Sequence, residues 1–325
     1  MATSTREIWL DTRLSELPRP EDFSAHTRTL ADPRPGEVLV RTTHLAMDPG
    51  LRSRFRDEDA PHGTAVIGQA LGVVAHSEDE RTPPGARVRG RWEWAEYAVA
   101  TAADLDVVAT DTSPAAELGP LGWAGQTAYV GIFDIARPRP GEVIFISSAA
   151  GTVGLLAGQF AKRLGAYVIG SAGGAEKVDL VLASGFDAAF DYKAEDPASA
   201  LARLAPGGLD IYFDNVGGAQ LQAAFEHLRM HGRTVCCGSV SGYNSAGDPT
   251  TLTGLRRIVT NRLSIRGFVL WDHPDAGQRR EQILTWLNEG DIVHPVTEYR
   301  GLDSAPSAFI AMLSGHHPGR TIVAL

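Results

Sequence analysis

The stretch Val143-Ile144-Phe145-Ile146-Ser147-Ser148-Ala149-Ala150-Gly151-Thr152-Val153-Gly154 decides the fold of this 325-residue chain. Its first five residues are an apolar run, typical of a strand buried on both faces of a parallel sheet. A turn with small residues at Ala149, Gly151 and Gly154 follows at once, and we expect a helix over 153–164, ended by Gly165. This order of strand, turn and helix predicts a sheet covered by helices on both faces.

The residues that follow repeat the alternation. We expect further strands at 166–171, 188–191, 209–214, 233–237 and 263–268, and helices at 176–184 and 219–230. An Ala- and Gly-rich, helix-compatible segment at 115–136 precedes them. Repeated strand–helix–strand units of this length predict an α/β fold of the Rossmann type, with a doubly wound parallel sheet.

The ends of the chain have a different character. Short strands separated by Gly, Pro and charged turns are expected at 37–43, 65–75, 86–91 and 94–100, and strand-like residues return at 320–325. Such spacing is typical of a compact, barrel-like β domain. The sequence therefore predicts a discontinuous β domain, 1–115 and 297–325, into which an α/β domain, 116–296, is inserted.

Charge and hydropathy exclude several classes of partner. The formal net charge of −9 argues against a general affinity for nucleic acid or an anionic membrane surface. No apolar run approaches the roughly 20 residues that cross a bilayer. The first residues, Met1 to Glu7, lack the apolar core of a secretory signal, so a cytoplasmic location is expected.

The cysteine and histidine pattern predicts no zinc site. The two cysteines, Cys236 and Cys237, are adjacent, and neighbouring cysteines rarely pair with each other. The histidines are scattered, with His316-His317 as the close pair, and no Cys-x-x-Cys or His-Glu-x-x-His spacing occurs. We therefore expect neither a structural nor a catalytic metal.

The turn Ala149-x-Gly151-x-x-Gly154 is a dinucleotide fingerprint with alanine in place of its first glycine. Gly151 would let the backbone approach a pyrophosphate, and Gly154 would let the helix pack closely on the strand. The helix N-terminus, including Thr152 and Val153, would supply N–H groups to the phosphates. The bare motif also occurs in ordinary tight turns, but its position between a buried strand and a helix favours a nucleotide.

The residues after the second expected strand distinguish between the two nicotinamide cofactors. An NAD site usually places an acid there to hold the ribose 2′-hydroxyl. This chain has Ile169-Gly170-Ser171-Ala172-Gly173-Gly174 instead, with Lys177 just downstream. Lys177 would attract a 2′-phosphate, although it also has the features of a solvated helix residue. The missing acid favours NADP(H).

With these residues the chain resembles the medium-chain dehydrogenase/reductase superfamily. More narrowly it resembles the zinc-free branch of prostaglandin reductase, leukotriene 12-hydroxydehydrogenase and alkenal double-bond reductases. The most specific matches are Phe213-Asp214-Asn215-Val216-Gly217-Gly218 and Cys237-Gly238-Ser239-Val240-Ser241-Gly242-Tyr243-Asn244. Looser matches occur at Met47-Asp48-Pro49 and Trp94-Ala95-Glu96-Tyr97. The resemblance implies a GroES-like β-barrel domain beside the Rossmann domain, and a homodimer paired through the last strand of the nucleotide sheet.

The resemblance also implies roles for individual residues. Lys177 and Tyr192 would flank the 2′-phosphate, and His317 matches a family asparagine that touches the cofactor. The nicotinamide side would be bordered by Asn215, by Cys237, Gly238 and Ser239 in the loop to Tyr243, and by Phe268, Val269 and Leu270. Each role has an alternative: Asn215 as a helix cap, Tyr192 as a rim aromatic, and Phe268 as core.

These residues lead to a hypothesis of function. NADPH would deliver hydride to the β-carbon of an α,β-unsaturated ketone or aldehyde, and the resulting enolate oxygen would need a hydrogen-bond donor. Without zinc that donor is a hydroxyl or an amide, and Tyr243 is the candidate, assisted by the cofactor ribose. The enolate would then be protonated by solvent or by Tyr243. The alternative is that Tyr243 only shapes the pocket wall.

One departure from the family and three rival functions complete the interpretation. Gly50 stands where the family commonly has a tyrosine that faces the substrate pocket, so a wider or less polar pocket is expected. An NADPH-dependent quinone reductase is the nearest rival. An alcohol dehydrogenase is disfavoured because it normally polarises the carbonyl with a cysteine-held metal. A non-catalytic NADPH-binding protein is the third alternative.

Overall fold

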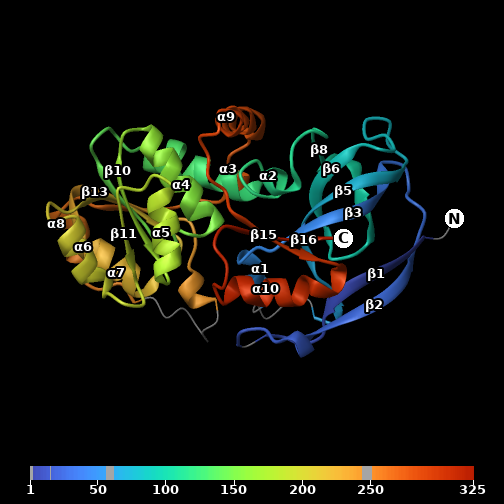
Figure 1. Cartoon of the computed structure of the whole chain (residues 1–325), viewed down its shortest axis with the longest axis horizontal. Helices are drawn as coiled ribbons and strands as arrows, with labels where there is room; N and C mark the ends of the chain where they lie inside the picture. Colours follow the sequence, from blue (N-terminus) through green and yellow to red (C-terminus); the bar gives the residue numbers. More distant parts are fainter. Residues whose placement is uncertain (1–2, 15, 56–61, 244–250) are drawn as a thin grey trace. The chain divides into compact units, whose positions relative to one another are not determined.

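The computed structural model describes residues 3–14, 16–55, 62–243 and 251–325. The chain forms two compact units: Met1–Leu118 with Val296–Leu325, and Gly119–Pro295 (Figure 1). Each unit has its own β-sheet structure and its own buried core. Within the described ranges, every helix is too short or too polar to cross a membrane.

The first unit is built from β-strands. A three-stranded sheet has the order β2-β1-β4, and a seven-stranded sheet has the order β15-β16-β3-β5-β6-β8, with β7 paired to β3. The strands are β1 (Thr3–Leu10), β2 (Phe23–Leu30), β3 (Glu37–Ala46), β4 (Thr64–Ala65), β5 (Ile67–Ser77), β6 (Arg87–Glu93), β7 (Tyr97–Thr101), β8 (Asp106–Val107), β15 (Val296–Arg300) and β16 (Arg320–Ala324). Its helices are α1 (Gly50–Arg54), α2 (Pro114–Leu118) and α10 (Ala305–Leu313).

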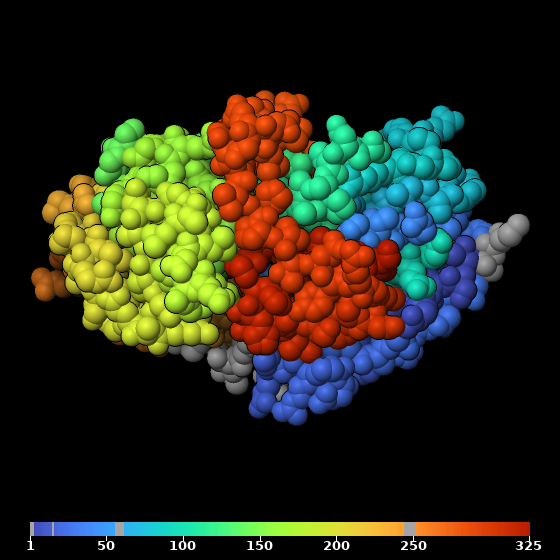
Figure 2. Space-filling model, viewed as in Figure 1, coloured from blue at the N-terminus to red at the C-terminus, as the bar shows by residue number. Residues whose placement is uncertain are grey.

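Aromatic packing joins the two segments of the first unit. Trp94, which is fully buried, lies 5.7 Å from the ring of Phe309 on α10, measured between ring centroids. Phe55 contacts Phe309 from another side at 5.9 Å. The C-terminal strand β16 also pairs with β3, and the C-terminal residues, red in Figure 2, pack directly on the blue N-terminal ones. The C-terminal segment is therefore part of this core, because it supplies both a sheet strand and a core aromatic.

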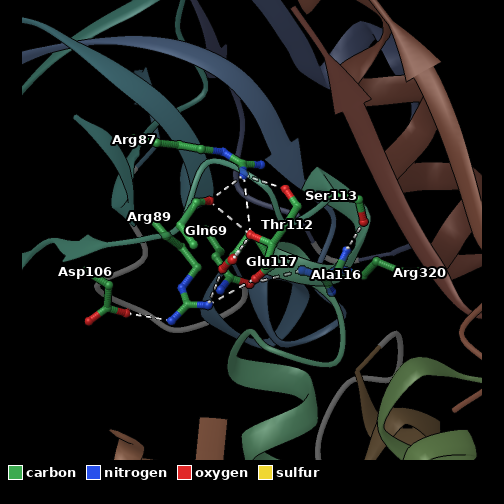
Figure 3. Close-up of polar contacts among 10 residues, drawn as sticks. Gln69, Arg87, Arg89, Asp106, Thr112, Ser113, Ala116, Glu117 and Arg320 are labelled. Atoms are coloured by element: carbon green, nitrogen blue, oxygen red, sulfur yellow. Dashed lines mark hydrogen bonds and ion pairs between the residues drawn. The ribbon is translucent and has the colours of Figure 1, made fainter. Parts of the chain in front are cut away.

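A buried ionic network holds α2 against β6 (Figure 3). Arg89 donates to Glu117 at 3.2 Å and to Asp106 at 2.8 Å, and the Arg89 and Glu117 side chains are only 2% and 0% exposed. Arg87 donates to the carbonyl oxygens of Thr112 and Ala109, at 2.5 and 2.9 Å. These bonds fix the segment that ends the first unit, since charges at this depth require partners.

The second unit contains a six-stranded parallel sheet in the order β11-β10-β9-β12-β13-β14. Its strands are β9 (Val143–Ile146), β10 (Tyr167–Ala172), β11 (Ala188–Asp191), β12 (Leu209–Asp214), β13 (Leu228–Cys236) and β14 (Ser264–Gly267). Counted from β9, the strand order is 3-2-1-4-5-6, which is the doubly wound Rossmann arrangement. The predicted fold class is confirmed.

Helices cover the sheet of the second unit (Figure 1). They are α3 (Trp123–Tyr129), the π-helical η3 (Val130–Ala136), α4 (Thr152–Arg163), α5 (Ala175–Ala183), α6 (Pro197–Leu204), α7 (Gly218–His227), α8 (Arg256–Thr260) and α9 (Ala276–Asn288). Ile144, Phe145 and Ile146 on β9 have no exposed surface. The central strand is thus buried on both faces, as its apolar run predicts.

The helix-compatible segment 115–136 is helical over most of its length, as α2, α3 and η3, with a break between α2 and α3. Two local expectations were wrong. The helix expected to reach residue 230 ends at His227, because Leu228 already pairs with Leu209 on β12. The expected strand 65–75 is two strands, β4 and β5.

The elements that the sequence pattern did not predict include β1, β2, α6, α8, α9 and α10. In β1 an inward position is held by Glu7, which is 1% exposed and bonded to Arg28 at 2.7 Å. A buried carboxylate at that position interrupts the apolar alternation by which a half-buried strand is recognised. The pattern of α9 is weak for a similar reason, because the buried residues of this helix include Arg279.

The buried network predicts an asymmetric effect of two glutamate substitutions. Glu117→Ala should lower the free energy of unfolding by about 3–5 kcal/mol, because the buried Arg89 guanidinium loses its buried ionic partner, whereas Asp106, the other carboxylate with which it pairs, is 62% exposed. The exposed Glu78, which pairs with His76, is the control, and Glu78→Ala should cost less than about 0.5 kcal/mol. Urea unfolding measures both. Equal losses would contradict a structural role of the Arg89–Glu117 pair.

Candidate cofactor and active site

The glycine turn links β9 to α4. Gly151 is the N-cap of α4, which begins at Thr152, one residue before the predicted start. Ser148 has a left-handed backbone with φ +51°, and its carbonyl oxygen accepts the Gly151 N–H at 3.0 Å. At the other end Gly165, with φ +79°, follows the C-cap Leu164, so its predicted role in ending the helix is confirmed.

Close packing explains the small residues of this turn. A Cβ on Gly154 would lie 2.3 Å from the Ser148 carbonyl oxygen, so any side chain there would separate α4 from β9. Ala149, which replaces the first glycine of the motif, is itself buried. Its methyl group fits because the facing residue on β10 is Gly170, whose Cβ would lie 2.8 Å away. The alanine is thus compensated by a glycine on the neighbouring strand.

A basic corner lies at the carboxyl ends of β10 and β11. A Cβ on Gly173 would lie 2.9 Å from the Tyr192 hydroxyl and 3.0 Å from Lys193 Cε, so both side chains lie against this glycine. The Lys177 N–H donates to Gly174 at 3.2 Å, which places the first turn of α5 beside them. Burial, and the charge of Lys193, lower the pKa of Lys177. Lys177 is therefore half-buried next to a second cation, not a fully solvated helix residue.

Lys193 is a site residue that sequence reasoning missed. Its only sequence signal was its position directly after Tyr192 at a strand end. The carboxylate of Asp191, in the same corner, accepts hydrogen bonds from the backbone. Hydrogen bonds from the Gly174 and Lys193 backbone N–H groups lower the pKa of Asp191, and the Lys193 bond is 2.9 Å long. Asp191 thus joins the two strand ends that carry the cations.

Asp214, at the carboxyl end of β12, is the hub of the neighbouring corner. Its Oδ1 accepts the Tyr212 hydroxyl at 2.7 Å and the N–H groups of Val216 and Gly217 at 2.8 and 2.7 Å. The residue is 2% exposed. Burial raises the pKa of Asp214, and these hydrogen bonds oppose the shift. The carboxyl group shapes the turn that carries Asn215.

The side chain of Asn215 does not cap a helix. Its Nδ2 donates to the Ser147 carbonyl oxygen at 2.7 Å, and its backbone N–H donates to Ser147 Oγ at 2.9 Å. The N-cap of α7 is Gly217, with φ +74°. Asn215 therefore ties the end of β12 to the end of β9, where the strand order of the sheet reverses. Open parallel sheets bind their ligands at this switch point.

The loop after β13 lies beside Asn215. The Cys237 and Gly238 N–H groups donate to the Asp214 carbonyl oxygen at 2.8 and 3.1 Å, and the Val240 N–H donates to Asn215 at 3.2 Å. These bonds bring Cys237, Gly238 and Ser239 to the switch point. Asn244, quoted with this motif, lies outside the described residues.

Tyr243 ends the same loop. Burial raises the pKa of Tyr243, while a hydrogen bond from the Ser239 backbone opposes the shift. The phenol is half-buried and its oxygen is held by the loop itself. An oxygen that accepts a backbone N–H still has its own proton to donate.

The three residues after β14 differ in exposure. Leu270 is core, with 8% exposed, while Val269 is 53% exposed. Phe268 is half-buried, with Cζ 3.0 Å from the position of a Cβ on Gly131. The core alternative for Phe268 is thus partly right, and Val269 is the residue of the three that a ligand reaches most easily.

His317 and Gly50 lie in the first unit. The His317 ring Nε2 is 3.1 Å from the Tyr299 hydroxyl, so a partner within its own unit orients the imidazole. The predicted contact of His317 with a cofactor stays a prediction. Gly50 is the exposed first residue of α1, and nothing lies within 4 Å of its Cβ position. Neither backbone nor packing requires a glycine there.

Among the described residues, no group of three or more His, Cys, Asp or Glu side chains is placed to hold a metal ion. The two thiols are also poorly suited as ligands. Burial raises the pKa of Cys236 to about 11 and that of Cys237 to about 12, with Asp214 contributing to both. Both thiols therefore stay protonated near neutral pH, whereas the thiolate is the metal ligand.

The Asp214 hub predicts different outcomes for two substitutions. Asp214→Ala removes the acceptor of two backbone N–H groups, so hydrogen exchange at Val216 and Gly217 should accelerate about 5- to 100-fold, at about 1–3 kcal/mol per lost acceptor. Asp214→Asn keeps an oxygen in the same place and should retain most of the protection. Hydrogen exchange at these two amides, measured by NMR or mass spectrometry, distinguishes the two variants. Unchanged exchange in the alanine variant would show that the turn is held by other contacts.

Comparisons with known proteins agree with this geometry. Residues 152–288 match the family model "Zinc-binding dehydrogenase", and residues 6–108 match "N-terminal domain of oxidoreductase". The 2-alkenal reductase (NADP(+)-dependent) of Nicotiana tabacum is 34% identical, over 98% of this chain and 97% of the relative. Prostaglandin reductase 1 of Sus scrofa is 33% identical, over 94% of both chains.

A solved structure is equally similar. The crystal structure of CurA in complex with NADPH from Vibrio vulnificus superposes with a TM-score of 0.92, at 31% identity and over 98% of both chains. With identities above 30% over almost its whole length, the chain belongs to the medium-chain dehydrogenase/reductase superfamily, in the family of the alkenal double-bond reductases and prostaglandin reductases.

Proposed function

We propose that this chain is an NADPH-dependent reductase that saturates the carbon–carbon double bond of α,β-unsaturated ketones or aldehydes. The observation that carries the proposal is the basic corner: Tyr192 and Lys193 lie against Gly173, Lys177 follows Gly174 in the first turn of α5, and the Asp191 carboxylate is bonded to the backbone. The names of the tobacco relative and of the NADPH complex support the same reaction and cofactor.

The fit of NADP(H) rests on charge. Two lysines close enough to depress a pKa repel each other, and a dianionic 2′-phosphate between them relieves that repulsion. The N-terminus of α4, Gly151 to Gly154, suits the pyrophosphate because N–H groups and a positive dipole end face outward there. Asn215, the loop Cys237 to Ser239 and Val269 would then border the nicotinamide, which supplies a hydride when the cofactor is bound.

Lys177 provides the test of cofactor choice. Lys177→Ala should raise the KM for NADPH roughly 10- to 100-fold, the value of one charge-assisted bond, and should change the KM for NADH less than about twofold. Lys162→Ala is the control, because Lys162 pairs with Asp187 at 2.7 Å at the far end of α4. Steady-state kinetics with both cofactors measure the ratio. Equal effects on NADPH and NADH would contradict a 2′-phosphate contact.

Tyr243 is the proposed donor to the developing enolate oxygen. Because burial raises its pKa, the phenol is protonated at neutral pH, and the Ser239 contact holds the oxygen in one place. A fixed donor stabilises a charge that appears only during reaction, without reorganising when it does. The enolate α-carbon then takes a proton from solvent or from the phenol.

Tyr243→Phe removes this donor and keeps the ring. We expect kcat on a simple enone to fall by roughly 10²-fold, as for one oxyanion donor, with the KM for NADPH unchanged. Steady-state turnover measured by NADPH absorbance is the readout. Unchanged turnover would assign Tyr243 to the pocket wall. Turnover with quinones alone would favour a quinone reductase, and tight NADPH binding without turnover would favour a non-catalytic protein.

The edge of the parallel sheet supports the proposed homodimer. All four residues of β14 are exposed, although β14 is a sheet strand. Ile265 is 41% exposed, and Val259 on the preceding α8 is 77% exposed. An edge strand has unpaired backbone N–H and C=O groups, so the β14 edge of a second copy could pair with it and extend the sheet. Sedimentation equilibrium should give a dimer for the native chain and a monomer for Ile265→Lys. A monomeric native chain would contradict the pairing.

A further inference from the structure

Two tryptophans of the second unit pack against each other, with Trp123 half-buried and Trp271 exposed. Trp123 is the first residue of α3, and Trp271 lies in the short helix η5 (Leu270–Asp272). Their ring centroids are 5.1 Å apart with planes at 83°, an edge-to-face contact. Trp271 is 64% exposed, and its neighbour Val269 is 53% exposed. Contiguous exposed apolar surface is a common feature of ligand-binding grooves.

The topology places this pair at the ligand-binding edge of the sheet. The Ala136 carbonyl oxygen, at the end of η3, accepts a hydrogen bond at 2.5 Å from Arg233, whose register partner on β12 is Ile211. Gly131, earlier in the same helix, lies against Phe213 near the end of β12. The helical stretch α3–η3 therefore runs antiparallel to the strands, and its first residue, Trp123, reaches their carboxyl ends.

Trp271 reaches the same edge from the other direction. It follows the carboxyl end of β14, Gly267, by four residues. The segment between them includes the exposed Val269, which would border the nicotinamide of a bound cofactor. Ligands of doubly wound sheets lie over the carboxyl ends of the strands, so the acceptor must lie close to this segment. The aromatic pair is thus continuous with the proposed acceptor site.

We propose that the Trp123–Trp271 pair binds an aromatic substituent of the acceptor, and that the enzyme therefore prefers aryl-substituted enones over alkyl enones of the same skeleton. The inference rests on the proposed function. In an edge-to-face pair, part of the indole surface stays uncovered. An aromatic ring of the acceptor that packs on this surface would bury apolar area and could adopt the stacked or edge-to-face geometry that aromatic rings prefer. Neither indole is a reacting group; the pair acts on substrate affinity.

The test compares two enones that differ by one group. In trans-4-phenylbut-3-en-2-one a phenyl group replaces the terminal methyl of trans-pent-3-en-2-one. Trp271→Ala should lower kcat/KM for the phenyl enone about tenfold, mainly through KM, and change that for the methyl enone less than about twofold. Trp123→Phe should give a smaller loss of the same kind.

Tyr167→Ala is the matched control. Tyr167 begins β10, so it is an exposed aromatic at the opposite, amino edge of the same sheet, with 41% exposed. This variant should leave the ratio of the two enones unchanged. Equal losses on both enones in Trp271→Ala, or an unchanged ratio, would overturn the proposal. A shift of Trp271→Ala to a smaller sedimenting species with an unchanged ratio would also overturn it, by assigning the indole to a contact between copies.

A binding measurement separates this inference from the proposed function. The saturated ketone 4-phenylbutan-2-one can be titrated by ligand-observed NMR, which needs no turnover. The native chain should bind it several-fold more tightly than Trp271→Ala does. If the native chain reduces neither enone, the proposed reaction fails, while the titration still decides whether the tryptophan pair binds an aryl group. Equal affinities of both proteins would overturn the inference even if reduction is observed.

Discussion

The close approach of α4 to β9 is the constraint on which the nucleotide-binding unit depends. A Cβ added at Gly154 would lie 2.3 Å from the Ser148 carbonyl oxygen, so only glycine allows this approach. The same contact directs the helix N-terminus at the switch point of the sheet, where β9 has β10 on one side and β12 on the other. The strand ends that carry the basic corner and Asn215 therefore surround one helix terminus.

Buried polar groups then fix the loops around that terminus. Asp191 joins the ends of β10 and β11 through backbone N–H groups, and Asp214 does the same for the turn after β12. In both places the carboxylate accepts hydrogen bonds from backbone N–H groups of the protein itself. In the proposed cofactor site, this arrangement would leave the two lysines as the charges available to a phosphorylated ribose.

The sequence predicted the fold well because parallel strands are buried on both faces and appear as continuous apolar runs, as in Val143 to Ile146. It failed where burial is polar. Glu7 in β1 and Arg279 in α9 occupy inward positions through partners that are distant in sequence or lie in the backbone. Within the site, Lys193 was missed because only the fold of the chain brings it to Gly173. The roles of Tyr243 and His317 stay predictions, since each depends on a ligand's position.

The central claim is that hydride moves from NADPH to the β-carbon of a conjugated carbonyl compound. The most direct measurement uses NADPH that carries deuterium at the transferable position of the nicotinamide, with trans-pent-3-en-2-one as acceptor. We expect a saturated ketone with deuterium on the β-carbon, located by NMR. Deuterium on the carbinol carbon of an unsaturated alcohol, or NADPH oxidation without any deuterated product, would contradict it.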